Sequence, residues 1–382
     1  MSLSMAERPL RVVVCGTTFG QVYLEGLRHA GPDLELVGIL AHGSRRSVQC
    51  AEHYGVPLYS DPRELPSEVD AACVVVRSGL LGGSGAELAR TLMARGIHVI
   101  QEHPLHHDEL VKCLQTARSA GVVYQLNSFY PHVLNVRSFI AAAHELQRHT
   151  PALYIDAACG FQLAYSLLDI LGNVLSSVRP WRLAPRSATV EHVRRPGEDV
   201  PFQSIDGVIG AVPMTLRIQN QMDPGDPDNH AHIDHRITIG TDGGNLTLLN
   251  THGPIVLSRR PRYPHAPRDP SSAPYFEERS CERSAPSATV IGPYEPPGFR
   301  EMFESHWPPA VRHALEQLRA AIITGENPLL RGHYHLSLCR LWQEVTASLG
   351  PPELIRREAP GPLSAEAVEA IVRAGTQLEA VA

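Results

Sequence analysis

From Leu10 to Asn127 the chain alternates short apolar runs, rich in β-branched residues, with segments whose apolar residues recur at helical spacing. The apolar runs are Arg11–Cys15, Leu34–Leu40, Ala72–Val76, His98–Gln101 and Val122–Leu126. The helical segments between them are Gly20–His29, Ser44–Tyr54, Gly85–Arg95 and Asp108–Ser119. Continuous apolar strands joined by amphipathic helices are typical of a parallel sheet covered on both faces. The alternation therefore predicts an α/β domain with a doubly wound parallel sheet over residues 1–127.

After Pro131 the pattern changes to that of an α+β domain, which we assign to residues 128–382. Helices are expected over His132–His149, Gln162–Val174, Pro309–Thr324, Gly332–Leu349 and Ser364–Leu378. Strands are expected over Ala152–Ala158, Val212–Gln221, Ile233–Thr241, Asn245–Asn250 and Pro254–Ser258. The turn Asp242-Gly243-Gly244 is a hairpin signal, which favours a large, mostly antiparallel sheet. The Pro- and Ser-rich stretch Arg259–Pro297 is expected to be a long irregular excursion.

Composition and charge exclude several classes of protein. The formal net charge is −6, which provides no broad basic surface for a nucleic acid. No apolar run reaches the roughly 18 residues that a membrane span needs, and Met1–Pro9 has no feature of a signal peptide. The 7 cysteines are scattered and none forms a C-x-x-C pair, so neither a disulfide framework nor a zinc site is indicated. These observations favour a reducing, cytoplasmic compartment.

The first strand runs into the turn Gly16-Thr17-Thr18-Phe19-Gly20, and a helix follows at once. A glycine turn between a strand and a helix lets backbone N–H groups approach a pyrophosphate at the helix N-terminus. The spacing is G-x-x-x-G and not the full G-x-G-x-x-G fingerprint, so an ordinary strand-to-helix turn is the alternative. Because this turn is the first crossover of a βαβ array, we interpret the domain as a Rossmann-type dinucleotide-binding domain.

The end of the second strand indicates which dinucleotide is bound. An NAD site has Asp or Glu there for the ribose 2′-hydroxyl. The sequence has no carboxylate at that point, and Ser44, Arg45 and Arg46 follow. Because arginine pairs bidentately with phosphate, these residues favour the 2′-phosphate of NADP(H). The alternative is a solvated helix start with two surface arginines.

The third strand is followed by Arg77, Ser78 and the glycine-rich loop Gly79–Gly85. Ligands of doubly wound sheets bind outside the carboxyl ends of the strands, so this loop is expected to face the cofactor. Arg77 and Ser78 are therefore candidate cofactor-binding residues, and a flexible connection is the alternative for the glycines.

The fourth strand ends in Glu102-His103-Pro104, which resembles the Glu-Lys-Pro motif of the glucose-fructose oxidoreductase, inositol dehydrogenase and rhizopine-catabolism family. In that family the lysine helps hydride transfer at a carbinol, and His103 stands in its place here. A second family motif, D-x-G-x-H-x-x-D, superposes on Gln162, Ser166 and Asp169, so that Ser166 takes the place of its histidine. These departures argue against an NADP-dependent sugar or polyol dehydrogenase, which remains the first alternative.

Longer strings are similar to thiazolinyl imine reductases. They are Phe19-Gly20, Leu36-Val37-Gly38, Ala41-x-Gly43-Ser44, Val75-Val76-Arg77-Ser78, His98-Val99-Ile100-Gln101-Glu102-His103-Pro104-Leu105-His106, Phe129-Tyr130-Pro131-His132, Asp223-Pro224-x-Asp226-Pro227-Asp228 and Leu338-x-Arg340-Leu341-Trp342-Gln343. The resemblance covers about residues 10–350. It implies NADPH-dependent reduction of a thiazoline to a thiazolidine on a carrier-protein-tethered intermediate, in nonribosomal siderophore assembly of the yersiniabactin and pyochelin type. It also implies a nonribosomal peptide synthetase as partner, and the wider family implies a homodimer through the outer face of the antiparallel sheet.

Reduction of a C=N bond needs a hydride at carbon and a proton at nitrogen. His103 and Tyr130 stand at strand ends where such a donor is needed, and the resemblance implies both as general acids. Tyr130 is placed first, because a phenol with an unperturbed pKa of ~10 stays protonated where an imidazole titrating near ~6.5 does not. A hydrogen-bonded turn residue and a wall residue are the respective structural alternatives.

Two further possibilities were weighed. The histidine clusters at 103–107, 230–235 and 333–335 suggest a metal, but none has the paired cysteines of a structural zinc site, and we expect no metal. A non-catalytic NADP-binding regulator is the second alternative, and two retained proton donors at the strand ends argue against it.

Overall fold

The computed structural model describes residues 7–376 except 79–81, 186–199, 227, 262–284, 293–294, 327, 357 and 360. Its first layer is the parallel sheet that the sequence predicted, with strand order β3-β2-β1-β4-β5-β6. The strands are β1 (Leu10–Cys15), β2 (Leu34–Leu40), β3 (Leu58–Tyr59), β4 (Ala71–Val74), β5 (His98–Glu102) and β6 (Tyr124–Asn127). Every neighbouring pair in this sheet is parallel. The two-residue strand β3 was not predicted, because it is too short to show a periodicity.

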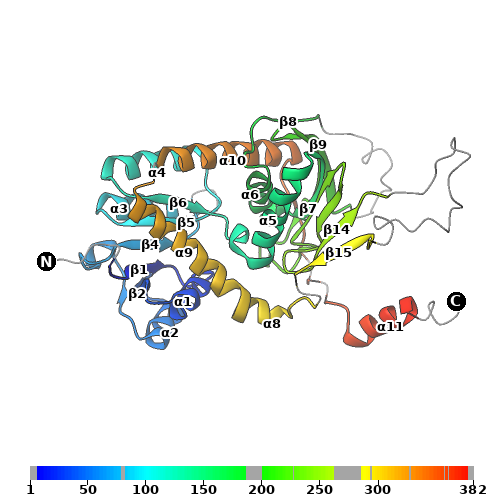
Figure 1. Cartoon of the computed structure of the whole chain (residues 1–382). Coiled ribbons are helices and arrows are strands. Elements are labelled where there is room, and N and C mark those ends of the chain that lie inside the picture. The colour runs from blue at the N-terminus through cyan, green and yellow to red at the C-terminus, as the bar shows by residue number, and fades with distance from the viewer. Residues whose placement is uncertain are drawn as a thin grey trace, which may run out of the picture.

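Helices cover both faces of this sheet, and they begin and end close to the predicted bounds (Figure 1). They are α1 (Gly20–Arg28), α2 (Arg45–Tyr54), the 3₁₀ turn η1 (Pro62–Glu64), α3 (Gly85–Ala94) and α4 (His107–Ala120). Gly55 and Gly121 adopt left-handed conformations directly after α2 and α4, where glycine ends a helix at little steric cost. The doubly wound α/β fold is confirmed.

The second sheet has eight strands in the order β15-β14-β13-β12-β7-β10-β9-β8. The strands are β7 (Ala152–Gly160), β8 (Trp181–Leu183), β9 (Phe202–Ile209), β10 (Val212–Gln219), β12 (His235–Thr241), β13 (Gly244–Leu248), β14 (Ile255–Arg259) and β15 (Ala288–Ile291). All pairings are antiparallel except that of β7 with β10. A further pair joins β11 (Gln221–Met222) to β16 (Glu353–Leu354). The predicted large, mostly antiparallel sheet is confirmed.

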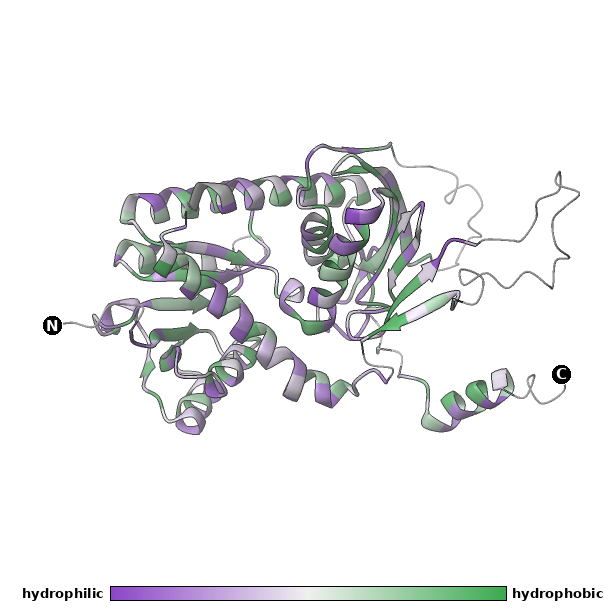
Figure 2. Ribbon diagram, in the orientation of Figure 1, coloured by the Kyte–Doolittle hydropathy of each residue, from purple (hydrophilic) through white to green (hydrophobic). Residues whose placement is uncertain are grey.

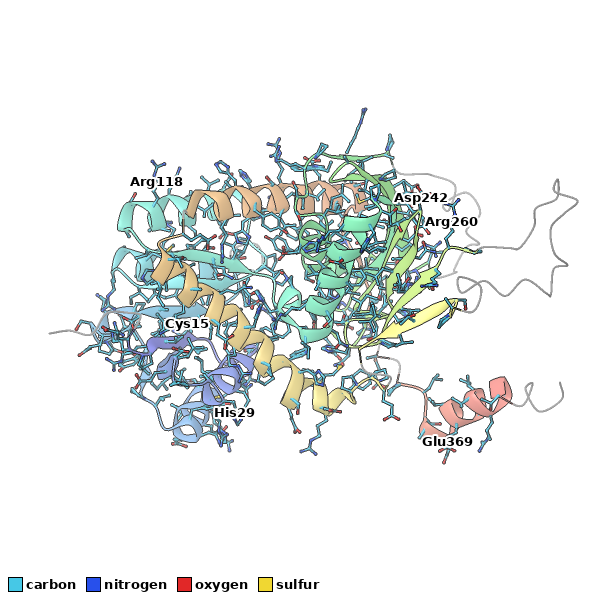
Figure 3. All side chains as sticks on the ribbon, in the orientation of Figure 1. Cys15, His29, Arg118, Asp242, Arg260 and Glu369 are labelled. Atoms are coloured by element: carbon cyan, nitrogen blue, oxygen red, sulfur yellow. The ribbon has the colours of Figure 1, made fainter. Side chains whose placement is uncertain are left out.

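The predicted hairpin is present, whereas the strands β8, β9 and β15 differ from the expectation. The predicted hairpin closes as Thr241 pairs with Gly244, and Figure 3 labels Asp242 beside Arg260, to which it is ion-paired at 3.0 Å. Strands β8 and β9 were not expected, since they lack clean alternation. The stretch Arg259–Pro297 was expected to be irregular, but β15 within it pairs with β14; residues 262–284 and 293–294 of this stretch lie outside the described part.

Helices α5 (Leu134–His149) and α6 (Ala164–Val174) lie against one face of the second sheet (Figure 1). The helix expected from His132 begins instead at Leu134, after the 3₁₀ turn η3 (Tyr130–His132), because Val133 is extended at φ −64° and ψ 133°. A second 3₁₀ turn, η4 (Phe161–Leu163), precedes α6. Many of the residues of the site described below lie at or near the starts of these two helices.

The C-terminal helices are α8 (Phe299–Glu301), the π-helical turn η5 (Met302–His306), α9 (Trp307–Thr324), α10 (Pro328–Leu349) and α11 (Ala365–Thr376). Helices α9 and α10 run back to the first sheet, whereas α11 lies away from it (Figure 1). Helix α9 packs against α1, and α10 packs against α4 and α6. Residues 377 and 378 of the last predicted helix lie outside the described part.

The core follows the apolar strands of both sheets (Figure 2). Six of the cysteines are buried and free: Cys15, Cys50, Cys73, Cys113, Cys159 and Cys339. Among the residues that the structure describes, no helix is long and apolar enough to cross a membrane.

Candidate functional site

The glycine turn after β1 can be built only with glycine at its first position. Gly16 has φ +95°, and its N–H donates to the Leu40 carbonyl at 3.0 Å. A Cβ atom there would stand 2.6 Å from the Val75 carbonyl oxygen, which is closer than non-bonded atoms approach. Cys15, labelled in Figure 3, marks the strand end where this turn begins. The turn is thus fixed by backbone sterics and leads directly into α1.

The turn leaves hydrogen-bond donors for an anion. The backbone N–H groups of Thr17, Thr18 and Phe19 make no hydrogen bond to another residue of the described part. They lie at the N-terminus of α1, whose helix dipole favours negative charge. Such donors fit the pyrophosphate of a dinucleotide, as the sequence predicted for residues 16–20.

Arg46 reaches from α2 to the glycine turn. Its Nη1 donates to the Thr18 hydroxyl at 3.2 Å, although 28 residues separate the two. Arg45 and Arg46 are exposed, and neither is ion-paired with an acidic residue of the described part. Ser44 caps α2, where its Oγ accepts from the Ser47 N–H at 3.3 Å. The structure therefore brings Arg46 to the turn, while the Ser44 side chain has a structural partner.

Ser78 and Arg77 differ in what they contact. The Ser78 hydroxyl is buried and donates to the Pro104 carbonyl at 2.5 Å, which ties the loop after β4 to the end of β5. Arg77 is exposed, and its backbone carbonyl accepts from the Gly85 N–H at 2.9 Å. Residues 79–81 of the predicted glycine-rich loop lie outside the described part. The Ser78 hydroxyl thus helps to hold the segment 102–104 in place.

Glu102, at the end of β5, is held by a buried polar network. Its Oε1 accepts from the Tyr23 hydroxyl and from Asn127 Nδ2, the latter at 2.9 Å. Asn127 Nδ2 also lies 2.6 Å from the Tyr23 oxygen. Burial, and then the Glu102 charge, raise the pKa of Tyr23 well above its ordinary value. The carboxylate is therefore fixed beside His103.

His103 is oriented by three contacts. Its Nδ1 lies 3.2 Å from the Asn127 carbonyl and 3.5 Å from Glu102 Oε2. Its ring stacks on Tyr165 of α6, with the centroids 5.0 Å apart. Because a carbonyl can only accept, Nδ1 carries a proton and Nε2 is an acceptor in the neutral ring. His103 can therefore donate a proton from Nε2 only when the ring is doubly protonated.

Tyr130 stands on a strained turn at the end of β6. Phe129 has φ 64° and ψ −61°, and the Tyr130 N–H donates to the Ser128 carbonyl at 2.8 Å, which closes a γ-turn. Such a conformation costs on the order of 1–3 kcal/mol for a non-glycine residue and clusters at functional sites. The Tyr130 hydroxyl makes no hydrogen bond within the described part of the chain. It is thus a free donor at a position that the backbone holds under strain.

The surroundings of Tyr130 keep its phenol protonated. Its ring lies edge-on to His235, with the centroids 4.7 Å apart. Burial first, and then the charges of Asp234, Asp228 and Glu102, raise the pKa of Tyr130 far above its ordinary value. A phenol in this environment is neutral throughout the physiological pH range and can donate to a strongly basic nitrogen.

His235 is the residue of this site that sequence reasoning left without a role. It was weighed only as part of a metal cluster, yet it is fully buried at the start of β12. Its Nε2 lies 2.9 Å from the Ser166 hydroxyl, and its Nδ1 lies 2.9 Å from the Thr251 hydroxyl. Burial, and then the nearby His252, lower the pKa of His235 to about 3, so the ring is neutral. His235 comes close to α6 because β12 pairs with β7. This pairing joins distant parts of the chain, so no local sequence pattern reveals it.

Asp169 lies on α6, the helix that also carries Ser166 and Tyr165. Its carboxylate accepts from the hydroxyls of Ser128 and Tyr334 at 2.5 and 2.6 Å, and from Asn173 Nδ2 at 3.0 Å. Burial raises the pKa of Asp169 from its ordinary value. The Ser128 contact fixes the residue two positions before Tyr130. Helix α6 therefore supports His103 through Tyr165, and Tyr130 through Asp169.

An aromatic wall links this region to the glycine turn. Trp307 at the start of α9 lies edge-on to Phe19 and Phe129, at centroid distances of 5.9 and 5.2 Å. Phe19 and Phe129 are themselves 5.3 Å apart. The sequence assigned no role to Trp307. Trp307 also lies edge-on to Tyr130 at 6.4 Å, so these rings connect Tyr130 to the glycine turn.

The histidine clusters show no metal arrangement in the part of the chain that the structure describes, where no three His, Cys, Asp or Glu side chains are grouped to hold an ion.

Comparison with known proteins agrees with this geometry. Residues 10–128 match the family model described as "Oxidoreductase family, NAD-binding Rossmann fold". Residues 150–258 match the model described as "Thiazolinyl imine reductase Irp3-like, C-terminal". Together the two ranges cover more than half of the chain. No curated protein sequence gives a significant match.

Solved structures share the fold at low sequence identity. An oxidoreductase from Agrobacterium radiobacter, solved with NAD+, L-tartaric acid and magnesium, has a TM-score of 0.63 at 12% identity, over 87% of this chain and 94% of that one. KijD10, a 3-ketoreductase from Actinomadura kijaniata solved with NADP and TDP-benzene, has a TM-score of 0.61 at 16% identity, over 91% and 100%. A dehydrogenase from Chromobacterium violaceum has a TM-score of 0.62 at 14% identity, over 97% and 99%.

These structures show the fold alone, whereas the two family models confirm the resemblance drawn from the sequence strings. Residues 10–128 thus belong to the oxidoreductase family with an NAD-binding Rossmann fold, and residues 150–258 are of the thiazolinyl imine reductase Irp3-like, C-terminal type.

Proposed function

We propose that this protein reduces the C=N bond of a thiazoline to a thiazolidine, with NADPH as hydride source, on an intermediate tethered to the carrier protein of a nonribosomal peptide synthetase. One observation carries the proposal: a neutral phenol, Tyr130, is held on a strained γ-turn just after β6. The neighbouring strand β5 ends in Glu102, and His103 follows at the position where the wider family's motif has a lysine. The match of residues 150–258 to an Irp3-like domain supports the same substrate class.

The cofactor preference rests on the contact between α2 and the glycine turn. The unpaired guanidinium of Arg46 lies against Thr18, and Arg45 stands beside it at the N-terminus of α2. Two cations and a helix N-terminus form a favourable site for the additional phosphate that distinguishes NADP from NAD. The free N–H groups of residues 17–19 would hold the pyrophosphate. Bound there, the nicotinamide supplies the hydride.

Tyr130 would supply the proton to the ring nitrogen. Hydride addition to an imine carbon leaves a strongly basic nitrogen, so even a phenol of raised pKa is acidic enough to protonate it. His103, with Nδ1–H fixed on the Asn127 carbonyl, presents Nε2 as an acceptor in its neutral form. We assign it to orienting the substrate, and the phenolate regains its proton from solvent after turnover.

The proposed partner and assembly follow from the substrate and from the free sheet face. A tethered substrate requires a docking carrier protein, supplied by the synthetase. A second copy of the chain would pack on the face of the eight-stranded sheet opposite α5 and α6. Light scattering after size-exclusion chromatography should then give twice the mass of 41.8 kDa.

A single-turnover assay tests the proposed reaction. The full chain is mixed with NADPH and a carrier-tethered thiazoline, and reduced-nicotinamide absorbance and product mass are followed. We expect one equivalent of NADPH to be consumed for each gain of two hydrogens. NADPH binding without any gain of mass would exclude the proposal and favour a regulator, while oxidation of a sugar or polyol with NADP+ would favour the dehydrogenase alternative.

A further inference from the structure

A cavity of about 650 Å³ lies apart from the dinucleotide turn, between the end of β6, α5, α6, α9 and α10. Neither the residues of the glycine turn nor His103 or Tyr130 line it. It contacts the candidate site only through Ser128 and Asp169, whose side chains also line the cavity. Its volume is within the range of pockets that hold small molecules. Nothing in the proposed reaction uses it.

Two arginines line this cavity, Arg137 from α5 and Arg331 from α10. The Arg137 side chain is exposed, and its guanidinium makes no ion pair or hydrogen bond within the described part of the chain. Arg331 donates to Gln125 Oε1 at 2.6 Å and to Glu326 Oε2 at 3.0 Å. The acid on the wall is Asp169, which is already engaged by three donors. Arg137 therefore brings to the cavity a guanidinium that no carboxylate of the described part neutralises, whereas Arg331 is paired with Glu326.

Four histidines complete the lining. His132 and His313 meet through their Nδ1 atoms at 3.0 Å, so that one ring donates and the other accepts. Burial first, and then His313, Arg137 and Arg331, lower the pKa of His132 to about 3. Burial and Arg137 lower that of His313. His144 is exposed, with Nε2 2.8 Å from the Asn173 carbonyl. Without a bound anion the His132–His313 pair is neutral at pH 7.

The surroundings of His335 indicate that the cavity binds a ligand. It lines the cavity, is only 7% exposed, and both of its ring nitrogens are buried without a hydrogen-bond partner among the described residues. A buried polar group left unpaired is costly and rare in native structures. A hydrogen-bond acceptor on a ligand would pair with the ring N–H of His335. Together, the orphaned imidazole, two guanidinium groups and a shared-proton histidine pair form a built site.

We propose that this cavity binds the phosphate group of a small molecule. Arginine matches phosphate oxygens with paired N–H donors, and histidine adds a donor that is gained by protonation. An anion here favours the imidazolium form of the His132–His313 pair, so binding takes up a proton and tightens as the pH falls. Tyr334, whose hydroxyl is held by Asp169, and Gln317 are among the neutral polar groups that line the cavity. The inference is independent of the proposed reduction.

Calorimetric titration of the full chain with inorganic phosphate tests the proposal, with NADPH present to fill the dinucleotide site. We expect saturable binding that sodium chloride at matched ionic strength does not reproduce. Arg137→Gln should weaken it about tenfold, since one charge-assisted contact is lost. Arg148→Gln is the matched control, because Arg148 is an exposed arginine of the same helix, ion-paired with Glu145. Equal loss in both variants, or no loss in Arg137→Gln, would overturn the site.

Two further titrations test which class of anion binds and whether binding takes up a proton. Acetate at the same ionic strength should bind more weakly than phosphate, and tighter binding of acetate would overturn the phosphate assignment. Sulfate does not titrate near neutral pH, so its binding should still tighten from pH 8 to pH 6, and His313→Gln should remove that trend. A pH-independent sulfate affinity in the unmodified chain would contradict the role given to the histidine pair.

Discussion

Nε2 of His235 lies 2.9 Å from the hydroxyl of Ser166, and the two residues come from β12 and α6. The Ser166 hydroxyl donates to the Leu163 carbonyl at 2.9 Å, so its oxygen accepts from the His235 ring. Thr251 supplies the hydrogen bond to Nδ1. An imidazole therefore stands beside the position at which the wider family's motif has its histidine, and it is delivered by a strand instead of by the helix.

The position of His235 predicts the effect of restoring the family's histidine at position 166. Ser166→His places a second imidazole in a fully buried position that His235 already fills, and such overpacking costs roughly 1–3 kcal/mol. Urea unfolding should show that loss of stability. The double variant Ser166→His/His235→Ser should recover most of it, because the two side chains then exchange volumes. Ser166→Ala, which loses both buried hydrogen bonds of the Ser166 hydroxyl and leaves Nε2 of His235 without its hydroxyl partner, should cost roughly 1–3 kcal/mol. A fully stable Ser166→His chain would show that the two positions do not compete for space.

The assignment of Tyr130 as proton donor predicts a pH profile. Because burial and three carboxylates raise the pKa of Tyr130, the phenol stays protonated from pH 6 to pH 9, and the rate of reduction should be flat over that range. Tyr130→Phe should lower kcat by roughly 10²–10⁴-fold without unfolding the chain. If doubly protonated His103 were the donor, the rate would fall as the ring loses its proton on raising the pH.

His103→Asn is the matched variant for this assignment. It keeps a polar side chain at the ring position but cannot carry a second proton. We expect a smaller loss of kcat than in Tyr130→Phe, together with a higher KM, as for a residue that orients the substrate. A larger loss in His103→Asn, combined with a rate that declines at high pH, would transfer the role of donor to His103.

The contact between Arg46 and Thr18 predicts the cofactor preference. Arg46→Gln removes a phosphate-pairing guanidinium, so the KM for NADPH should rise by about tenfold or more while that for NADH hardly changes. Arg118→Gln is a suitable control, because Arg118 lies at the far end of α4 (Figure 3). Equal loss with both cofactors would assign Arg46 to the stability of the turn and not to the 2′-phosphate.

The sequence predicted what local patterns determine. The parallel sheet, its helices and the Gly16 turn follow from periodicity and from backbone sterics that a few neighbouring residues impose. His103 and Tyr130 could be proposed from the sequence because strand ends in such a sheet share one edge. His235, Tyr165 and Trp307 were missed, because each reaches the site through a pairing or helix packing between residues far apart in the chain. The strain at Phe129 was also invisible, since no glycine or asparagine marks it.

Buried neutral histidines predict sensitivity to acid. Burial, and then Arg331, lower the pKa of His335 to about 3 in the folded chain, whereas an unfolded histidine titrates near ~6.5. Between these two pH values the unfolded chain binds a proton that the folded chain does not. Each such group therefore removes about 1.4 kcal/mol of stability for every unit that the pH falls below ~6.5. His235 acts in the same direction.

His335→Leu tests this directly, because both ring nitrogens lack a partner and the leucine leaves nothing unsatisfied. In phosphate-free buffer the variant should be as stable as the unmodified chain at pH 7.5, or more stable, and should lose less stability by pH 5. Urea unfolding at four pH values measures the slope. His149→Leu, at an exposed position on α5, should leave that slope unchanged. Parallel slopes for the unmodified chain and His335→Leu would mean that His335 is already protonated, or has a partner, in the folded protein.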